Sequence, residues 1–305
     1  MAAWADASGM STPRPQRIQV SGRSGVTAAA PAKINLNLLV GPVRADGYHP
    51  LDSIVAKISL YDTLELQTRN DGRITLDCRG FEYGPPERNL AFRAARLLAE
   101  GRDVKGADML LKKAIPPGMG LGGGSSDAAA ALTGLNELWQ LHLSESALHA
   151  LACRLGSDVP LFLAPACVRM TGRGDILEPM AVHAFYVAII LPGFECSTPP
   201  VYAAYDRAAS PIGPQVDFEL LANRPPSAWR DRLTNDLAAP ARAICTKLAE
   251  LWDRVQAHSP AAIHLTGSGS GLFALFDSAA DARAFREGLP EDLRAMCVLA
   301  ENNPW

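Results

Sequence analysis

The sequence has no long uninterrupted run of apolar residues and no excess of basic charge. Its longest apolar stretch, Phe185 to Leu191, is far shorter than the roughly 18 residues that a membrane span requires. Lysine and arginine number 29 against 32 aspartates and glutamates, which gives a formal net charge of -3. Nucleic-acid-binding domains usually carry a clustered basic face instead. Neither a membrane nor a nucleic acid is therefore an expected partner.

Cysteine is also scarce. The six cysteines are scattered, without a Cys-x-x-Cys pair and without a histidine at metal-ligand spacing. A chain of 305 residues can bury a sufficient core without a disulfide framework. We therefore expect six free thiols that fill the core of a protein in a reducing compartment, the cytoplasm.

The N-terminal segment has little acidic charge and lacks the hydrophobic stretch of a secretory signal. We predict a disordered leader over residues 1–24. Because Arg14, Arg17 and Arg23 fall in this acid-poor segment, an organelle transit peptide leading to the plastid stroma is the alternative.

Beyond the leader, strand-like segments cluster early in the chain, which favours an α+β fold over a doubly wound parallel sheet. Lys33, Asn35 and Asn37 alternate with apolar residues and predict a long strand over 26–40. We expect further strands at 53–58, 63–67, 73–78, 108–114, 168–170, 185–190, on both sides of a glycine loop within 263–276, and at 295–300. Helices are expected at 90–100, 127–138, 144–154 (capped by Ser144), 237–257 and 280–288. Prolines predict loops at 198–200 and 225–226, and a boundary near Met180 divides the chain into domains of residues 25–180 and 181–305.

The glycine-rich segment that ends at Ser126 is the main functional signal. Its glycines leave successive backbone N–H groups unobstructed, and an alanine-rich helix is predicted from Asp127 onward. N–H groups and the dipole at a helix N-terminus favour an anion, and serine hydroxyls can contact a phosphate or its metal. The predicted nucleotide-binding residues are Pro116, Pro117, Gly118, Met119, Gly120, Leu121, Gly122, Gly123, Gly124, Ser125 and Ser126.

Other kinds of loop are also rich in glycine. No Gly-Lys-Ser or Gly-Lys-Thr follows it, which excludes a P-loop. Gly118, Gly120 and Gly123 match the dinucleotide pattern, so a nicotinamide-dependent oxidoreductase is an alternative. That pattern belongs to a first βαβ unit, with an acidic residue at a strand end, whereas Glu137 and Glu145 here lie in helical sequence. A flexible turn without a ligand is the third interpretation, which the serine pair and the following helix disfavour.

With this loop, the sequence resembles the GHMP kinases, the superfamily of galactokinase, homoserine kinase and mevalonate kinase. Residues 116–126 are similar to their second motif. The segment Pro-Ala-Lys-Ile-Asn-Leu-Asn-Leu at 31–38 resembles the first motif, and Leu-Thr-Gly-Ser-Gly-Ser-Gly-Leu-Phe at 265–273 resembles the third.

Three further segments narrow the resemblance to the branch whose acceptor is 4-diphosphocytidyl-2-C-methyl-D-erythritol, phosphorylated on its 2-hydroxyl. They are Arg-Ala-Asp-Gly-Tyr-His at 44–49, Leu-Gly-Ser-Asp-Val-Pro at 155–160 and Gly-Arg-Gly-Asp at 172–175. Two positions depart from the pattern of this branch. Met119 replaces a residue that is usually small, which predicts crowding of the nucleotide, and Asp175 replaces a frequent glutamate.

The resemblance implies a two-domain GHMP kinase fold, with an N-terminal domain like domain 2 of ribosomal protein S5 and a ferredoxin-like C-terminal domain. ATP with Mg²⁺ would bind between the domains, and the small-molecule acceptor is the implied partner of a monomer or weak homodimer. A GHMP kinase acting on homoserine or a mevalonate derivative is one alternative. A non-catalytic nucleotide sensor is another, which the presence of both Lys33 and Asp158 disfavours.

The resemblance also implies roles for single residues. Asp158 is the implied base or orienter of the acceptor hydroxyl, with Lys33 as its ionic partner. Without the resemblance, a turn carboxylate bonded to its own backbone and a solvated edge lysine would be the simpler interpretations. The implied substrate-binding residues are Asn35, on the strand face of Lys33, and Tyr48 and His49, which would recognise the cytidine.

The second glycine loop is given a supporting role near the phosphates, through Gly267, Ser268 and Gly269. A plain hairpin turn is its alternative. Thr198 lies in a Ser-Thr-Pro segment and stays unassigned.

Overall fold

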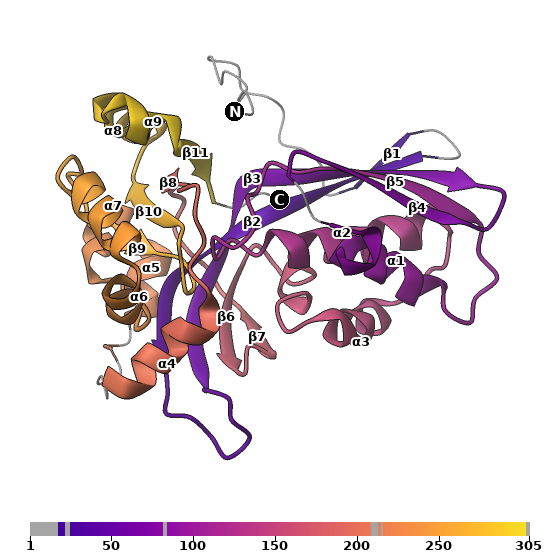
Figure 1. The fold of residues 1–305 in the computed structure, drawn as a ribbon, viewed down its shortest axis with the longest axis horizontal. Coiled ribbons are helices and arrows are strands. Elements are labelled where there is room, and N and C mark those ends of the chain that lie inside the picture. The colour runs from indigo at the N-terminus through magenta and orange to yellow at the C-terminus, as the bar shows by residue number, and fades with distance from the viewer. Residues whose placement is uncertain (1–17, 22–24, 82–83, 209–212, 215, 303–305) are drawn as a thin grey trace.

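The computed structural model describes residues 18–21, 25–81, 84–208, 213–214 and 216–302. The chain folds into two lobes, each built on its own β-sheet with helices packed against it (Figure 1). We call residues 18–179 the N-terminal lobe and residues 186–302 the C-terminal lobe. The α+β fold class predicted from the sequence is confirmed.

The sheet of the N-terminal lobe has seven strands. Five of them follow the order β1-β2-β3-β5-β4, and β6 and β7 extend the sheet from the first half of β3. Neighbouring strands are antiparallel except β4 and β5, which are parallel. The strands are β1 (Ile18–Ser21), β2 (Gly25–Val40), β3 (Leu51–Arg69), β4 (Ile74–Arg79), β5 (Gly106–Lys112), β6 (Cys167–Gly172) and β7 (Ile176–Pro179).

Strands β1, β3 and β7 differ from the sequence-based expectation, and β7 has no counterpart among the predicted strands. The two strands predicted at 53–58 and 63–67 are one continuous strand, β3, which pairs with β6 through residues 51–56 and with β5 through residues 63–69. Residues 18–21 lie inside the predicted disordered leader but form β1, because they pair antiparallel with the start of β2. The rest of the predicted leader, residues 1–17 and 22–24, lies outside the described residues.

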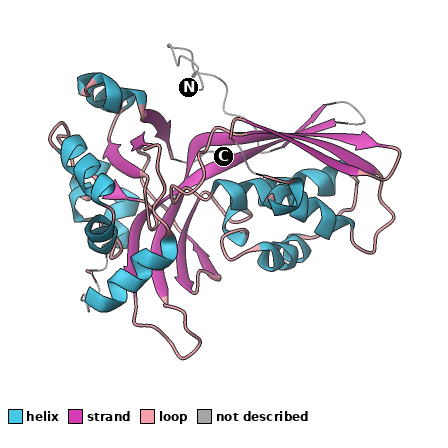
Figure 2. Cartoon of the chain, in the orientation of Figure 1, coloured by secondary structure: helices cyan, strands magenta, loops and turns pink. Residues whose placement is uncertain are grey.

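Three helices cover one face of this sheet (Figure 2). They are α1 (Leu90–Ala99), α2 (Gly123–Leu138) and α3 (Glu145–Leu155), accompanied by the short 3₁₀ helices η1 (Pro86–Arg88) and η2 (Pro160–Phe162). The small residues of α2 let it approach the sheet closely, since a Cβ at Gly134 would lie 2.6 Å from the Leu66 side chain. Ser144 caps α3 as predicted, its hydroxyl accepting a hydrogen bond from the N–H of Ala147.

The C-terminal lobe has a four-stranded antiparallel sheet of order β11-β8-β10-β9. Its strands are β8 (Tyr186–Ile190), β9 (His264–Leu265), β10 (Leu272–Phe276) and β11 (Cys297–Glu301). Its helices are α4 (Thr198–Ala208), α5 (Phe218–Asn223), η3 (Pro226–Ala228), η4 (Arg230–Arg232), α6 (Ala238–Ile244), α7 (Thr246–Gln256), α8 (Ala279–Gly288) and α9 (Glu291–Ala295).

Two expectations for this lobe are wrong. Residues 198–200 are not a loop but the first turn of α4, because proline lacks only an N–H that the first helical turn leaves unpaired in any case. The single helix predicted over 237–257 is divided into α6 and α7 at Cys245, whose φ of -121° and ψ of 89° are not helical.

A shared hydrophobic cluster joins the lobes. Ile34 of β2 and Ile58 of β3 contribute to it from the N-terminal lobe, and Phe185, Phe273 and Trp229 contribute from the C-terminal part of the chain; all five are at most 1% exposed. Such a dry, closely packed contact holds the two lobes in one arrangement. The site between them is therefore built on a stable frame.

The cysteines only partly follow the prediction. All six are free, but only Cys196 and Cys297 are buried, and Cys153 is exposed on α3. The expectation that every thiol fills the core is therefore wrong.

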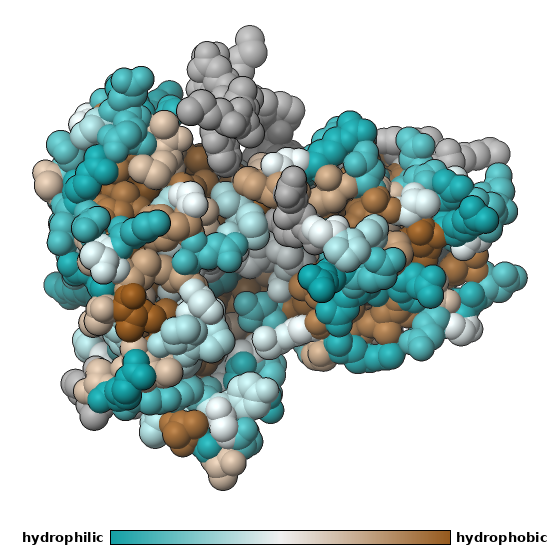
Figure 3. All heavy atoms as spheres, in the orientation of Figure 1, coloured by the Kyte–Doolittle hydropathy of each residue, from teal (hydrophilic) through white to brown (hydrophobic). Residues whose placement is uncertain are grey.

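None of the helices in the described ranges has the length and apolar character needed to cross a bilayer. Hydrophilic residues cover much of the outer surface of both lobes (Figure 3).

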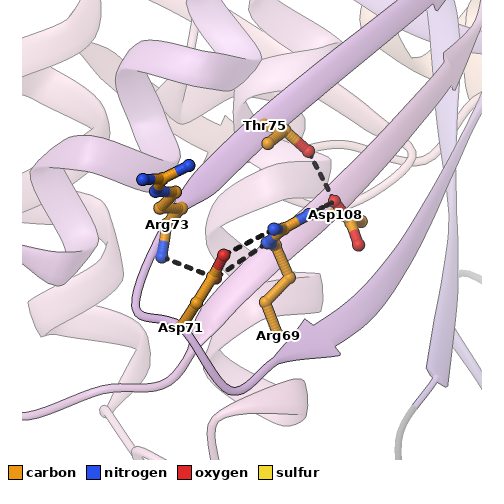
Figure 4. Close-up of polar contacts among 5 residues, drawn as sticks. All are labelled: Arg69, Asp71, Arg73, Thr75 and Asp108. Atoms are coloured by element: carbon orange, nitrogen blue, oxygen red, sulfur yellow. Dashed lines mark hydrogen bonds and ion pairs between the residues drawn. The ribbon is translucent and has the colours of Figure 1, made fainter.

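A polar network ties the turn after β3 to its neighbours, far from the contact between the lobes (Figure 4). The guanidinium of Arg69 binds Asp71 at 2.5 Å and Asp108 of β5 at 2.7 Å. Thr75 of β4 donates a hydrogen bond to Asp108 at 2.6 Å, and Asp71 accepts one from the N–H of Arg73 at 3.1 Å. The network links the ends of three adjacent strands at an exposed edge.

Candidate active site

A cleft of about 1070 Å³ contains nine of the nineteen residues that the sequence predicts for catalysis and binding, including every predicted catalytic and substrate-binding residue. Lys33, Asn35, Tyr48, His49, Gly120, Gly122, Asp158, Gly267 and Ser268 all line it. They come from β2, the loop between β2 and β3, the loop before α2, the turn after α3 and the second glycine loop, segments far apart in sequence. A second hollow of about 960 Å³, between α1 and β4, contains none of the predicted site residues.

The glycine-rich loop reaches the cleft as the start of a helix. Helix α2 begins at Gly123, four residues earlier than the predicted start at Asp127, so the last glycines and both serines form its first turn. Gly122 precedes the helix with a left-handed φ of 71°, which favours glycine. The unpaired N–H groups of this first turn and the helix dipole favour a phosphate here.

A close backbone approach explains a second glycine. A Cβ at Gly120 would lie 2.1 Å from the carbonyl oxygen of Thr266, in the second glycine loop. The N–H of Gly271 also donates to the carbonyl of Met119 at 3.3 Å, so the two glycine loops touch. One loop comes from each lobe, and their contact forms one wall of the cleft.

We call the predicted nucleotide-binding residues 116–126 the phosphate loop. Two of its residues are placed differently from expectation. The side chain of Met119 is 7% exposed and packs in the hydrophobic cluster between the lobes, so it does not crowd the cleft. Ser126 is 1% exposed, and its hydroxyl has no hydrogen-bond partner among the described residues. Ser126 is not among the described residues that line the cleft, so its hydroxyl lies behind the cleft surface.

The base of the loop is held by a buried charge cluster that the sequence did not reveal. The ammonium of Lys113, just before the loop, forms ion pairs with Asp62 of β3 and with Asp127, just after the loop. The side chains of all three are at most 2% exposed. Asp62 also accepts hydrogen bonds from the N–H groups of Ala114 and Ile115 at 2.6 and 2.8 Å. Both ends of the phosphate loop are thereby fixed to the sheet.

Lys33 lies in the middle of β2 with its ammonium in the cleft. Its Nζ donates to the side-chain oxygen of Asn35 at 2.5 Å, and its backbone N–H donates to Leu121 in the phosphate loop at 3.0 Å. Burial lowers the pKa of Lys33 from an ordinary 10.5 to about 8, while the negative charge of Asp158 raises it. The alternative of a solvated edge lysine is wrong, since Lys33 is 7% exposed.

Asp158 is half-buried in the turn between α3 and η2 and faces Lys33 across the cleft. The two groups interact electrostatically, but no direct ion pair joins them among the contacts of the described residues. The turn itself is tight, with Val159 donating to Gly156 and Phe162 donating to Val159. The carboxylate is therefore presented to the cleft by a short, internally bonded segment.

Asn35 is held by the protein on both sides of its amide. Its oxygen accepts from Lys33, and its nitrogen donates to Ser53 of β3 at 2.8 Å. Ser53 in turn donates to the carbonyl of Asn37 at 2.6 Å. This arrangement orients Lys33, and direct contact of Asn35 with a substrate stays a prediction.

Aromatic side chains gather at the other end of the cleft. Tyr48 is 53% exposed, and the guanidinium of Arg173 lies 3.7 Å from the centre of its ring. His49 is largely buried against Tyr202 of α4, with ring centres 5.2 Å apart. Its Nδ1 lies 2.8 Å from the carbonyl of Gly41 and therefore donates to it, while Nε2 faces Asp206 at 3.4 Å.

Several residues in the cleft were missed by sequence reasoning. Tyr202 and Asp206 lie on α4, whose start was predicted to be a loop, so no face could be assigned to them. Arg173 lies in the Gly-Arg-Gly-Asp segment at 172–175, which contributes to the family resemblance. Nothing in the sequence indicates that its side chain packs on the ring of Tyr48. Thr198, left unassigned, lines the cleft and hydrogen-bonds Ser268 at 2.8 Å.

In the part of the chain that the structure describes, no three histidine, cysteine, aspartate or glutamate side chains converge as a metal site would require. The carboxylates beside the phosphate loop are dispersed: Asp62 and Asp127 pair with Lys113, and Glu195 packs against Gly118, where a Cβ would lie 2.5 Å from its Oε1. Such a sparse donor set suits a magnesium ion that arrives bound to phosphate oxygens, because Mg²⁺ in kinase sites keeps few protein ligands.

Family models match both parts of the chain. Residues 89–165 match the GHMP kinases N terminal domain, and residues 217–295 match the GHMP kinases C terminal domain. The first match contains the phosphate loop and Asp158, and the second contains the second glycine loop.

Individual proteins are similar over nearly the whole chain. A 4-diphosphocytidyl-2-C-methyl-D-erythritol kinase from Salinibacter ruber is 37% identical, covering 90% of this chain and 98% of that protein. The enzyme of the same name from Prochlorococcus marinus is 38% identical, with coverage of 85% and 86%. A crystal structure of 4-(cytidine 5'-diphospho)-2C-methyl-D-erythritol kinase, 35% identical, superposes with a TM-score of 0.75 over 91% of this chain and 99% of that chain. Mevalonate kinase from L. major, 19% identical with a TM-score of 0.68, shares the fold.

Proposed function

This chain belongs to the 4-diphosphocytidyl-2-C-methyl-D-erythritol kinases, a family of GHMP kinases, and we propose how its cleft carries out that reaction. The enzyme transfers the γ-phosphoryl group of ATP to the 2-hydroxyl of 4-diphosphocytidyl-2-C-methyl-D-erythritol, a step of the non-mevalonate route to isoprenoid precursors. The single observation that carries the proposal is that Lys33 and Asp158 face each other between the phosphate loop and the aromatic end of one cleft. Membership of this family excludes the oxidoreductase interpretation.

ATP occupies the end of the cleft formed by the two glycine loops. Its phosphates lie against the first turn of α2, where N–H groups and the helix dipole stabilise negative charge. A magnesium ion bound to the phosphates of ATP would neutralise their charge and would need few ligands from the protein. The contact between Gly120 and Thr266 closes this end of the cleft from both lobes.

The acceptor occupies the aromatic end. The cytosine ring stacks on Tyr48 or Tyr202. His49 packs against Tyr202 with its ring nitrogens directed at Gly41 and Asp206, so a hydrogen bond from His49 to the base requires its ring to turn. Burial raises the pKa of Tyr202 to about 12, and the negative charge of the nearby Asp158 adds to this shift. Its phenol therefore stays protonated at neutral pH and can donate a hydrogen bond to the acceptor.

Asp158 orients the 2-hydroxyl and accepts its proton, and Lys33 stabilises the charge that develops on the transferring group. A lysine with a pKa of about 8 is still mostly protonated at pH 7, so it acts as a cation there. As pH rises through 8, Lys33 loses its proton and this stabilisation is lost. Positioning and charge neutralisation are the main demands of phosphoryl transfer, and both are met by these two side chains.

Replacing the carboxylate by an amide tests the central role. We expect Asp158→Asn to lower kcat by about 10²- to 10⁴-fold, the usual contribution of a positioned base, with ATP affinity nearly unchanged. Transfer from γ-labelled ATP measures kcat, and calorimetric titration measures ATP binding. Wild-type turnover in this variant would remove Asp158 from the mechanism.

A panel of acceptors tests the substrate. The cytidine-containing alcohol should be phosphorylated, whereas homoserine and mevalonate should not, because neither can stack between the aromatic residues. Activity confined to homoserine or mevalonate would overturn the substrate assignment while leaving the kinase chemistry intact.

A further inference from the structure

Lys57 is a second buried lysine beside the site, and nothing above assigns it a role. It lies in the middle of β3, is 1% exposed and stands directly opposite Lys33 in the register of β2 and β3. Side chains directly opposite each other in an antiparallel pair project from the same face, with Cβ atoms about 4.5–5.5 Å apart. Lys33 lines the cleft and Lys57 is not among the described residues that line it, so Lys57 lies behind the reacting groups.

Lys57 holds the segment that follows Asp158. Its ammonium donates to the carbonyls of Phe162 and Ala164, at 3.3 and 2.5 Å. Its backbone N–H donates to the carbonyl of Ala166 at 2.8 Å. Carbonyls at the end of a short helix have no partner within that helix, and a cation there satisfies them and interacts well with the dipole. One residue of β3 thus makes three bonds to residues 162–166.

The other side of this segment packs against the reacting groups. A Cβ at Gly122 would lie 2.7 Å from the ring of Phe162 and 3.2 Å from Cγ of Lys33, so these three residues meet at one point. Only Val159 stands between Asp158 and the first residue of η2. The Asp158 turn is therefore held between the phosphate loop on one side and Lys57 on the other.

We propose that Lys57 is a positioning residue that sets the separation between Asp158 and Lys33 during phosphoryl transfer. The β2–β3 register fixes Lys57 relative to Lys33, and the bonds from Lys57 to η2 and the following residues fix the Asp158 turn relative to β3. The strand pair therefore determines where the carboxylate stands. This inference rests on the proposed roles of Asp158 and Lys33 and adds a residue that touches neither substrate.

Lys57→Met tests it, because methionine keeps the unbranched shape and removes the donor. We expect kcat to fall about 10- to 100-fold, the effect of a displacement near 1 Å in a reacting group, with the KM for ATP nearly unchanged. Lys57→Arg keeps donors at the same place and should recover part of the lost kcat. Lys112→Met, on the exposed side of β5, is the matched control and should keep wild-type kcat. An undiminished kcat in Lys57→Met would overturn the proposal.

A double-mutant cycle with Asp158→Asn separates positioning from general support of the fold. If Lys57 acts through the carboxylate, Lys57→Met should have little further effect on kcat once Asp158 is asparagine. Equal losses in both backgrounds would show a merely structural role and overturn the proposal. Should Lys57→Met not yield folded protein, Lys57→Gln enters the same cycle. Asp158→Asn measured alone tests the proposed function. A failure of that function is therefore distinguishable from a failure of the role proposed for Lys57.

Discussion

Two clusters in the N-terminal lobe each place one cation between two aspartates, in opposite environments. In the first, Lys113 lies between Asp62 and Asp127 beneath the phosphate loop, and all three side chains are at most 2% exposed. In the second, Arg69 lies between Asp71 and Asp108 at the edge of the sheet, with side chains 29%, 44% and 50% exposed (Figure 4). An ion-pair distance of 2.5 Å occurs in both, between Lys113 and Asp127 and between Arg69 and Asp71.

The pKa of Asp127 in the buried cluster and those of Asp71 and Asp108 in the exposed cluster shift in opposite directions. Burial raises the pKa of Asp127 well above its ordinary value, although Lys113 opposes this shift. At the exposed edge, the hydrogen bond from Arg69 lowers the pKa of Asp71, and the hydrogen bonds from Thr75 and Arg69 lower that of Asp108. Desolvation, rather than the number of charges, therefore decides the sign. Removing a buried cluster that joins β3 to both ends of a loop also costs more unfolding free energy than removing one at the edge of a sheet.

The largest effect is expected from removing the buried cation. Lys113→Met leaves Asp62 and Asp127 side by side in the core, and breaking a buried ion pair in this way typically costs about 3–5 kcal/mol of unfolding free energy. Because both ends of the phosphate loop are released, the KM for ATP should rise as well. Urea unfolding and steady-state kinetics measure the two effects.

Lys112→Met is the matched control for this experiment. Lys112 is the neighbouring residue and pairs with Glu65, but it is 51% exposed. Its loss should change stability by no more than about 1 kcal/mol, as for other surface ion pairs. An equal loss of unfolding free energy in Lys113→Met and Lys112→Met would contradict the expected difference between buried and exposed ion pairs.

An intermediate effect is expected from Asp127→Asn, through the pH dependence of stability. Because its pKa is raised in the folded state, Asp127 stabilises the protein most below the ordinary aspartate pKa of about 3.9, and this stabilisation is lost as pH rises through the folded-state pKa. The amide cannot release a proton, so the variant should lose less stability than the wild type as pH rises above the ordinary aspartate pKa.

Asp108→Asn provides the opposite case. The pKa of Asp108 is lowered, so its stabilising effect is present above the ordinary pKa and is lost as pH falls. Removing it should lower stability slightly and evenly at neutral pH, and flatten the acid side of the stability curve, where the wild type loses the same stabilisation. Urea midpoints across pH measure both variants, and the same change of slope in both would refute the assigned directions.

The sequence predicted the parts of the site that depend on local pattern. The glycine loop, the alternation around Lys33 and the turns at 44–49 and 155–160 each report a local conformation, and the structure brings all of them to one cleft. Their roles in catalysis rest on the resemblance and stay predictions. The early start of α2 was missed because glycine has a low helix propensity, which the tertiary structure overrides at Gly123 and Gly124.

Contacts between distant segments could not be predicted. Asp62 and Lys113 are 51 residues apart, and Lys57 and Phe162 are 105 apart. An isolated lysine in a strand has the same local signature whether it is solvated or holds a catalytic turn. Tyr202 was missed for another reason, since Pro199 and Pro200 suggested a loop where a helix begins. In each case the decisive information is the register of the sheet or the packing of the lobes.

The smallest effect is expected at the exposed cluster. Arg69→Met removes contacts to both Asp71 and Asp108, but water and salt already screen these charges, and each aspartate keeps a hydrogen-bond donor, the N–H of Arg73 or the hydroxyl of Thr75. We expect a small loss of stability at low ionic strength that shrinks further in high salt, with kcat and the KM for ATP unchanged. Urea unfolding at two salt concentrations tests this. A loss comparable with that of Lys113→Met, or one insensitive to salt, would mean that the edge network supports the lobe as firmly as the buried one.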